Sequence, residues 1–147
     1  MIDTSRYQLG FVPPAGVDEE GLGRLVDAFY AKVRADEMLG PIFNREIEDW
    51  PHHLDKLKKF WASTMLKART YDGRPLPPHL KLPEISDAHF SRWLQLFRET
   101  AAEQMPEIGA PAVTAMAERI ATSFRMAIAF HRGEDSMQVM PIARESL

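Results

Sequence analysis

Apolar residues in the first part of the chain recur at spacings of three and four, which is the period of an amphipathic helix. The pattern begins at Asp18, and Gly40 with Pro41 should stop it, because these residue types commonly end helices. We therefore predict a first long helix between these points. Its apolar face consists of Leu22, Leu25, Val26, Phe29, Tyr30 and Val33.

A second helix should follow a short connector that contains Phe43. Asp49 can cap this helix, and Pro51 is tolerated in its first turn, where its missing N–H would have no intrahelical partner. Lysines occupy much of the remaining surface, at positions 56, 58 and 59. The shared face of the helix consists of His53, Leu57, Phe60, Trp61 and Thr64.

The stretch RTYDGRPLPP is rich in turn-forming residues, so regular structure should lapse from about residue 68 to at least His79. A third helix is expected after Pro83, capped by Ser86 or Asp87, with Phe90, Trp93, Leu94, Phe97 and Ala101 facing inward. Pro106 and Gly109 should end it. A fourth helix starts near Pro111, ends before Gly133, and lines up Val113, Met116, Ala117, Ile120, Phe124, Ala127 and Ile128.

Four substantial helices and no convincing strand predict an all-α protein. A chain of 147 residues has the size of one domain. We expect an N-terminal arm over 1–17, the helical domain over 18–133 and a C-terminal tail over 134–147.

Charge and composition narrow the function. The chain has 18 basic and 21 acidic residues, a net charge of −3 and no long basic run, so nucleic acid is a poor candidate partner. It has no cysteine, which excludes disulfides, thiolate ligands and haem attached through thioether bonds. No signal pattern or membrane-length apolar run is seen, so we expect a soluble, cytoplasmic protein that does not enter a membrane.

Common enzyme motifs are missing. The sequence contains no H-E-x-x-H, no glycine-rich phosphate loop, no G-x-S-x-G, and no Glu three residues before a histidine, as a di-metal carboxylate bundle would require. An obvious hydrolase or nucleotide-binding enzyme is therefore not indicated.

Three polar groups lie on predicted apolar faces: Tyr30, His53 and Trp93. Burying them is costly unless each finds a partner. They could bond to one another or to backbone carbonyls, or they could surround one small polar ligand. His52 is an alternative to His53, although it would point about 100° away from the apolar face.

His79 follows Pro77 and Pro78 and lies outside any long predicted helix. Prolines restrict the unfolded chain, so fixing this histidine costs little further entropy. This placement is typical of a tethered ligand.

The runs WPHHLDKLKKFW, YDGRPLPPHLKLP and HFSRWLQLF together resemble the group III truncated haemoglobins. The resemblance covers roughly residues 20 to 132. Its most specific parts are the spacing of Trp50, His53, Phe60 and Trp61, the Y-x-G-x-P-L-x-x-H-L-x-L-P segment and a tryptophan 14 residues after its histidine. The lack of any Gly-Gly pair also agrees with group III.

The resemblance implies a two-over-two helical sandwich that holds haem b, iron protoporphyrin IX, without a covalent bond. His79 would be the proximal iron ligand, and Tyr30, His53 and Trp93 would face a ligand on the distal side. Lys56 is a weaker candidate for a contact with a haem propionate. The residues expected to pack on or near the ring are Phe43, Leu57, Trp61, Phe90 and Phe124.

Three donors around a bound ligand would make O2 release slow. We therefore expect O2, NO, CO or peroxide as ligands and a redox reaction with a partner reductase, similar to that of an NO dioxygenase or a peroxidase. The alternatives are a haem protein that stores, scavenges or senses O2 without turnover, and a helical interaction module that never binds haem.

Overall fold

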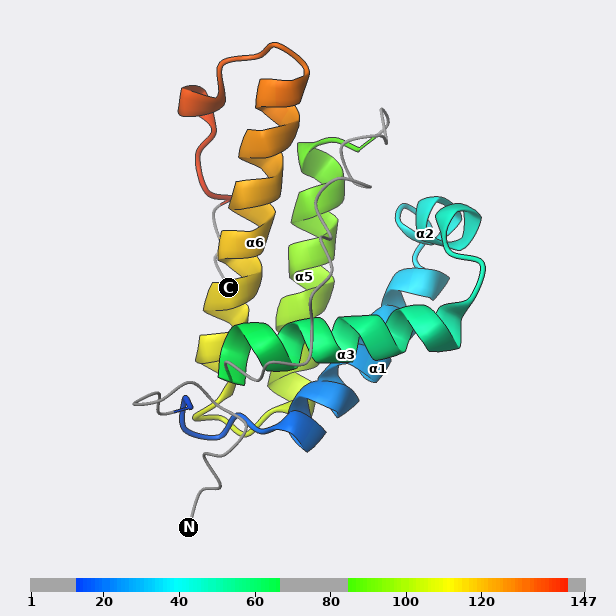
Figure 1. Ribbon diagram of the computed structural model, residues 1–147, viewed down its shortest axis with the longest axis vertical. Helices are drawn as coiled ribbons and strands as arrows, with labels where there is room; N and C mark the ends of the chain where they lie inside the picture. The colour runs from blue at the N-terminus through cyan, green and yellow to red at the C-terminus, as the bar shows by residue number, and fades with distance from the viewer. Residues whose placement is uncertain (1–12, 67–84, 143–147) are drawn as a thin grey trace.

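The structure is a computed structural model that describes residues 13–66 and 85–142 (Figure 1). The described residues form helices and contain no strand, so the predicted all-α class is confirmed. No helix among them has both the length and the apolar character needed to cross a membrane. The elements are α1 (Glu19–Ala35), α2 (Gly40–Glu46), α3 (Trp50–Leu66), α5 (Asp87–Gln104), α6 (Ala110–His131) and the 3-10 helix η1 (Ser136–Gln138).

The first helix ends earlier than its sequence pattern predicts. Asp18 caps α1 by accepting a hydrogen bond from the Gly21 N–H at 2.7 Å, but the helix stops at Ala35. The prediction that Gly40 and Pro41 stop this helix is wrong, because they form the first turn of α2. A proline fits there because the first N–H groups of a helix have no intrahelical acceptor.

Phe43 also departs from the prediction, since it lies within α2 rather than in a connector. The short helix forms because the backbone N–H groups of Phe43 and Ile47 both find helical acceptors, Leu39 O at 3.0 Å and Phe43 O at 2.9 Å. Phe43 is half-buried and packs on the core. Its position on a helix fixes its ring near α1.

The other helix starts follow the predicted caps. The carboxylate of Asp49 accepts from the backbone N–H of His52 at 3.1 Å, and α3 begins at Trp50 with Pro51 in its first turn. Ser86 is the N-cap of α5, and its backbone N–H donates to the His89 imidazole at 3.1 Å. The fourth long helix begins at Ala110, next to the expected Pro111.

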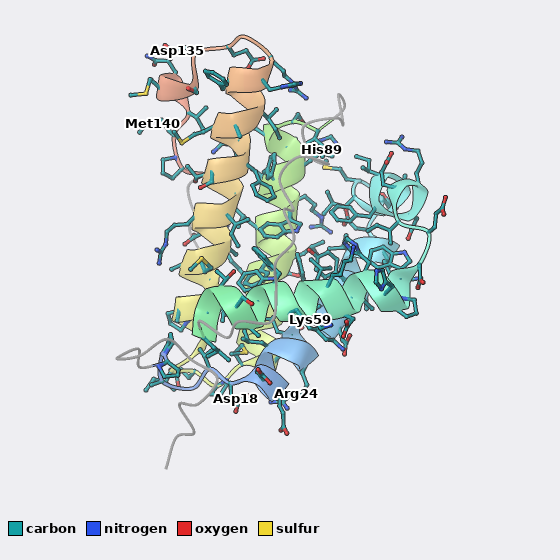
Figure 2. All side chains as sticks on the ribbon, in the orientation of Figure 1. Asp18, Arg24, Lys59, His89, Asp135 and Met140 are labelled. Atoms are coloured by element: carbon teal, nitrogen blue, oxygen red, sulfur yellow. The ribbon has the colours of Figure 1, made fainter. Side chains whose placement is uncertain are left out.

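The long helices are arranged as two pairs. Figure 1 shows α5 and α6 side by side, with α3 crossing their direction. The structure packs α1 against both α3 and α5, so α1 joins the two pairs. This is the predicted arrangement of the first and second long helices against the third and fourth. Figure 2 shows Asp18 and Arg24 near the start of α1 and His89 near the start of α5, at the opposite end of the molecule.

The buried face of α1 contributes the largest share of the core. Phe29 of α1 and Phe97 of α5 each expose only 1% of their surface, and the residues predicted for this face of α1 are all buried. Val17 is buried in the same core, and Ile142 packs against it. The division into arm, domain and tail stays a prediction.

A close backbone contact ties the segment before α1 to the connector between α5 and α6. Gly16 has a φ of +77°, in the region that favours glycine. A Cβ atom at Gly109 would lie 2.6 Å from the Gly16 carbonyl oxygen, so only glycine fits without a shift of the backbone.

The turn after α1 is held by Asp36, whose carboxylate joins α1, α2 and α5. One oxygen accepts from the backbone N–H groups of Met38 at 3.1 Å and Leu39 at 3.0 Å. The other accepts from the Arg92 guanidinium at 2.7 Å, and the Asp36 side chain is only 6% exposed. This carboxylate therefore fixes how α2 leaves α1.

Asp36 should make stability depend on pH. Burial raises its pKa, but hydrogen bonds from Leu39 and Arg92 outweigh burial and hold the pKa below its ordinary value. A lowered folded-state pKa gives stability that is complete above the unfolded-state pKa and is lost as the pH falls through the folded-state pKa. We expect Asp36→Asn to lower the free energy of unfolding by about 1 to 3 kcal/mol at pH 7 and by less at pH 3. Denaturant unfolding at the two pH values measures this, and an equal loss at both would contradict the account.

Candidate functional site

The candidate site is built around Tyr30, a polar side chain inside the aromatic core. Tyr30 exposes 5% of its surface. Its ring lies edge-on to Phe29 at a centroid distance of 4.7 Å, and the rings of Phe43 and Trp50 lie at 6.1 and 6.2 Å. Residues from α1, α2 and α3 thus surround the phenol.

Trp93 of α5 is the polar partner of Tyr30. Trp93 is half-buried and, like Tyr30, stands edge-on to Phe29, and its indole lies on the side of the Tyr30 oxygen, toward which it can only donate. The Trp93 ring is fixed by stacking on Phe97 at 5.8 Å and by an edge contact with Phe29 at 5.4 Å. Of the alternatives that the sequence leaves open, the structure favours a pairing of Tyr30 with Trp93, in which the tyrosine keeps its own O–H proton to donate.

The environment keeps this tyrosine protonated. Burial raises the pKa of Tyr30 to about 12, because the charged phenolate would lose its hydration. The hydrogen bond from Trp93 acts in the opposite direction, since it stabilises the phenolate, but it is the smaller effect. At neutral pH Tyr30 is therefore a neutral hydrogen-bond donor.

His53 reaches the same region from α3. It is half-buried, and its ring stands edge-on to Trp50, with centroids 5.9 Å apart and an interplanar angle of 89°. His52, one position earlier, is exposed. The structure therefore places His53 on the inner side of α3 and connects it to Tyr30 through Trp50.

Trp50 is a site residue to which the sequence analysis assigns no role. It is 7% exposed, and its indole N–H donates to the Asn44 side-chain oxygen at 3.2 Å. Its signal in the sequence was its position three residues before His53, which places both on one side of the helix. Nothing in the sequence indicated that Asn44 would be its partner.

The other predicted site residues are spread along the same helices. Trp61 is buried and stacks on Phe97 at 5.2 Å, while Leu57 and Phe90 are half-buried and pack on the core. Half-exposed apolar side chains of this kind suit a large flat apolar cofactor. Phe124 is half-buried on α6.

The described residues do not test the remaining predictions. Lys56 is exposed on α3, and no structural observation tests its expected contact with a propionate. His79 lies outside the described residues, so its role as an iron ligand stays a prediction. Within residues 13–66 and 85–142 there is no group of three or more His, Asp or Glu side chains that could hold a metal ion.

Comparison with known proteins gives one consistent result. No family model matches the chain. A curated relative, the group 3 truncated hemoglobin ctb of Campylobacter jejuni, is 42% identical over 88 residues, which cover 57% of this chain and 69% of the relative. The crystal structure of a group III truncated hemoglobin from Campylobacter jejuni matches with a TM-score of 0.72 and 35% identity, and the match covers 80% of this chain and 95% of that one.

The raised pKa of Tyr30 predicts a loss of stability at alkaline pH. A raised folded-state pKa gives stability that is complete below the unfolded-state pKa, near 10, and is lost as the pH rises toward 12. For a shift of this size, the difference is roughly 2 to 3 kcal/mol. Tyr30→Phe has no hydroxyl to ionise, so its stability should fall less between pH 9 and 12 than that of the unmodified protein. Denaturant unfolding across this range tests this, and parallel curves for the two proteins would rule it out.

Proposed function

This chain belongs to the group III truncated haemoglobins, and we propose on that premise that it holds haem b and binds O2 or a related small ligand beside Tyr30. The observation that best supports this is the burial of the Tyr30 hydroxyl near the Trp93 indole, with both rings edge-on to Phe29 in an aromatic core. A packed core without a ligand needs neither polar group there, since two apolar side chains would fill the space at lower cost.

The described residues fit the distal half of a haem pocket. Leu57, Trp61 and Phe90 lie on the helices α3 and α5, whose apolar surface would cover a flat macrocycle, and Phe43 and Phe124 are proposed to complete it. Burying a few hundred Å² of a macrocycle gains roughly 5 to 10 kcal/mol before ordering costs, so no covalent link is needed. His79 is proposed as the iron ligand on the other side, and Lys56 as a partner of a propionate.

Bound haem would supply an iron with one open coordination position, where the polarity of the pocket decides how a ligand is treated. Tyr30 holds its proton and donates it in a hydrogen bond to the ligand. An indole can only donate, so Trp93 leaves the Tyr30 hydroxyl proton free for the ligand. His53 is a second donor, or a gate that moves when a ligand enters.

Strong hydrogen bonding makes simple O2 delivery implausible, because a ligand held by several donors leaves slowly. We therefore propose that the protein consumes O2, NO or peroxide, with electrons supplied by a partner reductase. The alternative function is storage, scavenging or sensing of O2 without turnover.

The roles of Tyr30 and Trp93 can be measured by O2 dissociation. Tyr30→Phe keeps the ring but removes the donor, so O2 should dissociate at least about 10-fold faster, the value of a hydrogen bond to a partly charged group. Trp93→Phe should give a smaller increase, about 2- to 10-fold, if it acts partly through Tyr30. Stopped-flow displacement of O2 by CO measures both rates. Lys59→Ala, on the exposed face of α3, serves as the control (Figure 2). Unchanged dissociation in both aromatic variants would contradict the proposed site.

Turnover separates the two functions. With a generic reductase and NADPH, the unmodified protein should consume NO or peroxide catalytically, and His79→Ala should lose this activity because the iron would lack its protein ligand. Electrode measurements of NO and absorbance measurements of peroxide follow the reaction. Tight ligand binding with no more than one turnover per haem would instead favour storage or sensing.

A further inference from the structure

Trp50 of α3 is held by residues of two other helices, α1 and α2. It opens α3, yet its side chain is only 7% exposed. Its indole N–H donates to the Asn44 side-chain oxygen on α2 at 3.2 Å. The Arg34 guanidinium of α1 lies over its ring, with the central carbon 4.6 Å from the ring centroid.

Asn44, the acceptor that anchors Trp50, is itself held in place. The side-chain amide of Asn44 donates to the backbone carbonyl of Arg34 at 3.2 Å, so α2 is tied to α1 by the same residue that accepts the indole proton. Asn44 and Arg34 are exposed residues, whereas the ring they hold is buried. Trp50 therefore connects exposed residues of α1 and α2 to the interior of the protein.

The interior side of that ring touches two proposed distal residues. His53 stands edge-on to it at 5.9 Å and 89°, a geometry that aromatic pairs prefer. The Tyr30 ring lies 6.2 Å away and tilted by 46°. These contacts limit the rotation of the imidazole and the tilt of the phenol.

We propose that Trp50, anchored by Asn44, is a positioning residue that sets the orientation of Tyr30 and His53. This proposal rests on the proposed haem function. It adds that Trp50, at the junction of α1, α2 and α3, sets the geometry of the distal residues. Apolar packing alone would not require an indole, because a buried N–H must find an acceptor and a phenylalanine would avoid that cost. The acceptor is present on α2.

The contact with Asn44 can be tested on the full chain loaded with haem, with CO as the probe. Trp50→Phe keeps an aromatic ring but loses the N–H, and Asn44→Ala removes its acceptor. Both should split or broaden the infrared C–O stretching band and change the CO association rate by about 2- to 10-fold, the range expected when one aromatic contact no longer fixes its neighbour. The double variant should show no more than the larger single effect, because both changes remove one interaction.

Matched variants distinguish positioning from simple packing. Asn44→Asp keeps an acceptor oxygen for the indole but loses the amide that donates to the Arg34 carbonyl, so it should restore the single C–O band in part, while Lys59→Ala on the outer face of α3 should change nothing. Wild-type bands and rates in Trp50→Phe and Asn44→Ala, even with a lowered melting temperature, would overturn the proposal. Additive effects in the double variant would overturn it as well.

A second readout does not depend on haem. In the full chain with 13C-labelled histidine, the ring resonances of His53 should shift in Asn44→Ala, since the Trp50 ring would no longer be fixed beside it. No shift would contradict the positioning role. Failure of the unmodified chain to bind haem would retire the proposed function, whereas this measurement would still decide whether Trp50 orients His53.

Discussion

The burial of Tyr30 beside Trp93, around the shared ring of Phe29, is the constraint on which the site depends. A phenol and an indole in an aromatic core are each costly to bury, and pairing them reduces that cost while leaving the tyrosine proton unused. The pairing is possible because α1 packs on both α3 and α5. One face of α1 therefore supplies the centre of the core and also its polar group.

The junctions between helices, more than the helices themselves, fix the position of the Tyr30 side chain. Asp36 ends α1 and joins the following turn to α5 through Arg92. Asn44 then connects α2 to the first residue of α3. Because these junctions determine where α2 and α3 lie beside α1, they also determine which rings surround the phenol.

The start of α5 is held in a similar way. The Arg125 guanidinium of α6 makes two contacts with the Asp87 carboxylate, at 2.9 and 3.0 Å, and donates to the Met140 carbonyl oxygen at 2.6 Å. Arg132 donates to the Ile85 carbonyl oxygen at 3.1 Å. The start of α5 is thus fixed by α6 and by the residues that follow α6.

Periodicity predicted the buried face of α1 in full, because burial of an apolar stripe is a local property of the sequence, but on α3 it found Trp61 and missed the buried Ala62, Met65 and Leu66. It misjudged Gly40 and Pro41, since a proline that ends one helix and a proline that begins the next look alike without the intervening turn. It identified Tyr30, His53 and Trp93 as polar groups on apolar faces but could not say which of them would meet. Periodicity could not predict the contact of Asn44 with Trp50, because this contact depends on the docking of a separate short helix.

The most direct test of the account is a titration of the unmodified chain with haemin, followed by absorption spectroscopy. The account predicts a sharp Soret band that saturates at one haem per chain and shifts when the iron is reduced and exposed to CO. Haemin that keeps the spectrum of the free compound throughout the titration would contradict it, and the buried Tyr30 with the half-buried Trp93 would then be only a satisfied part of the core.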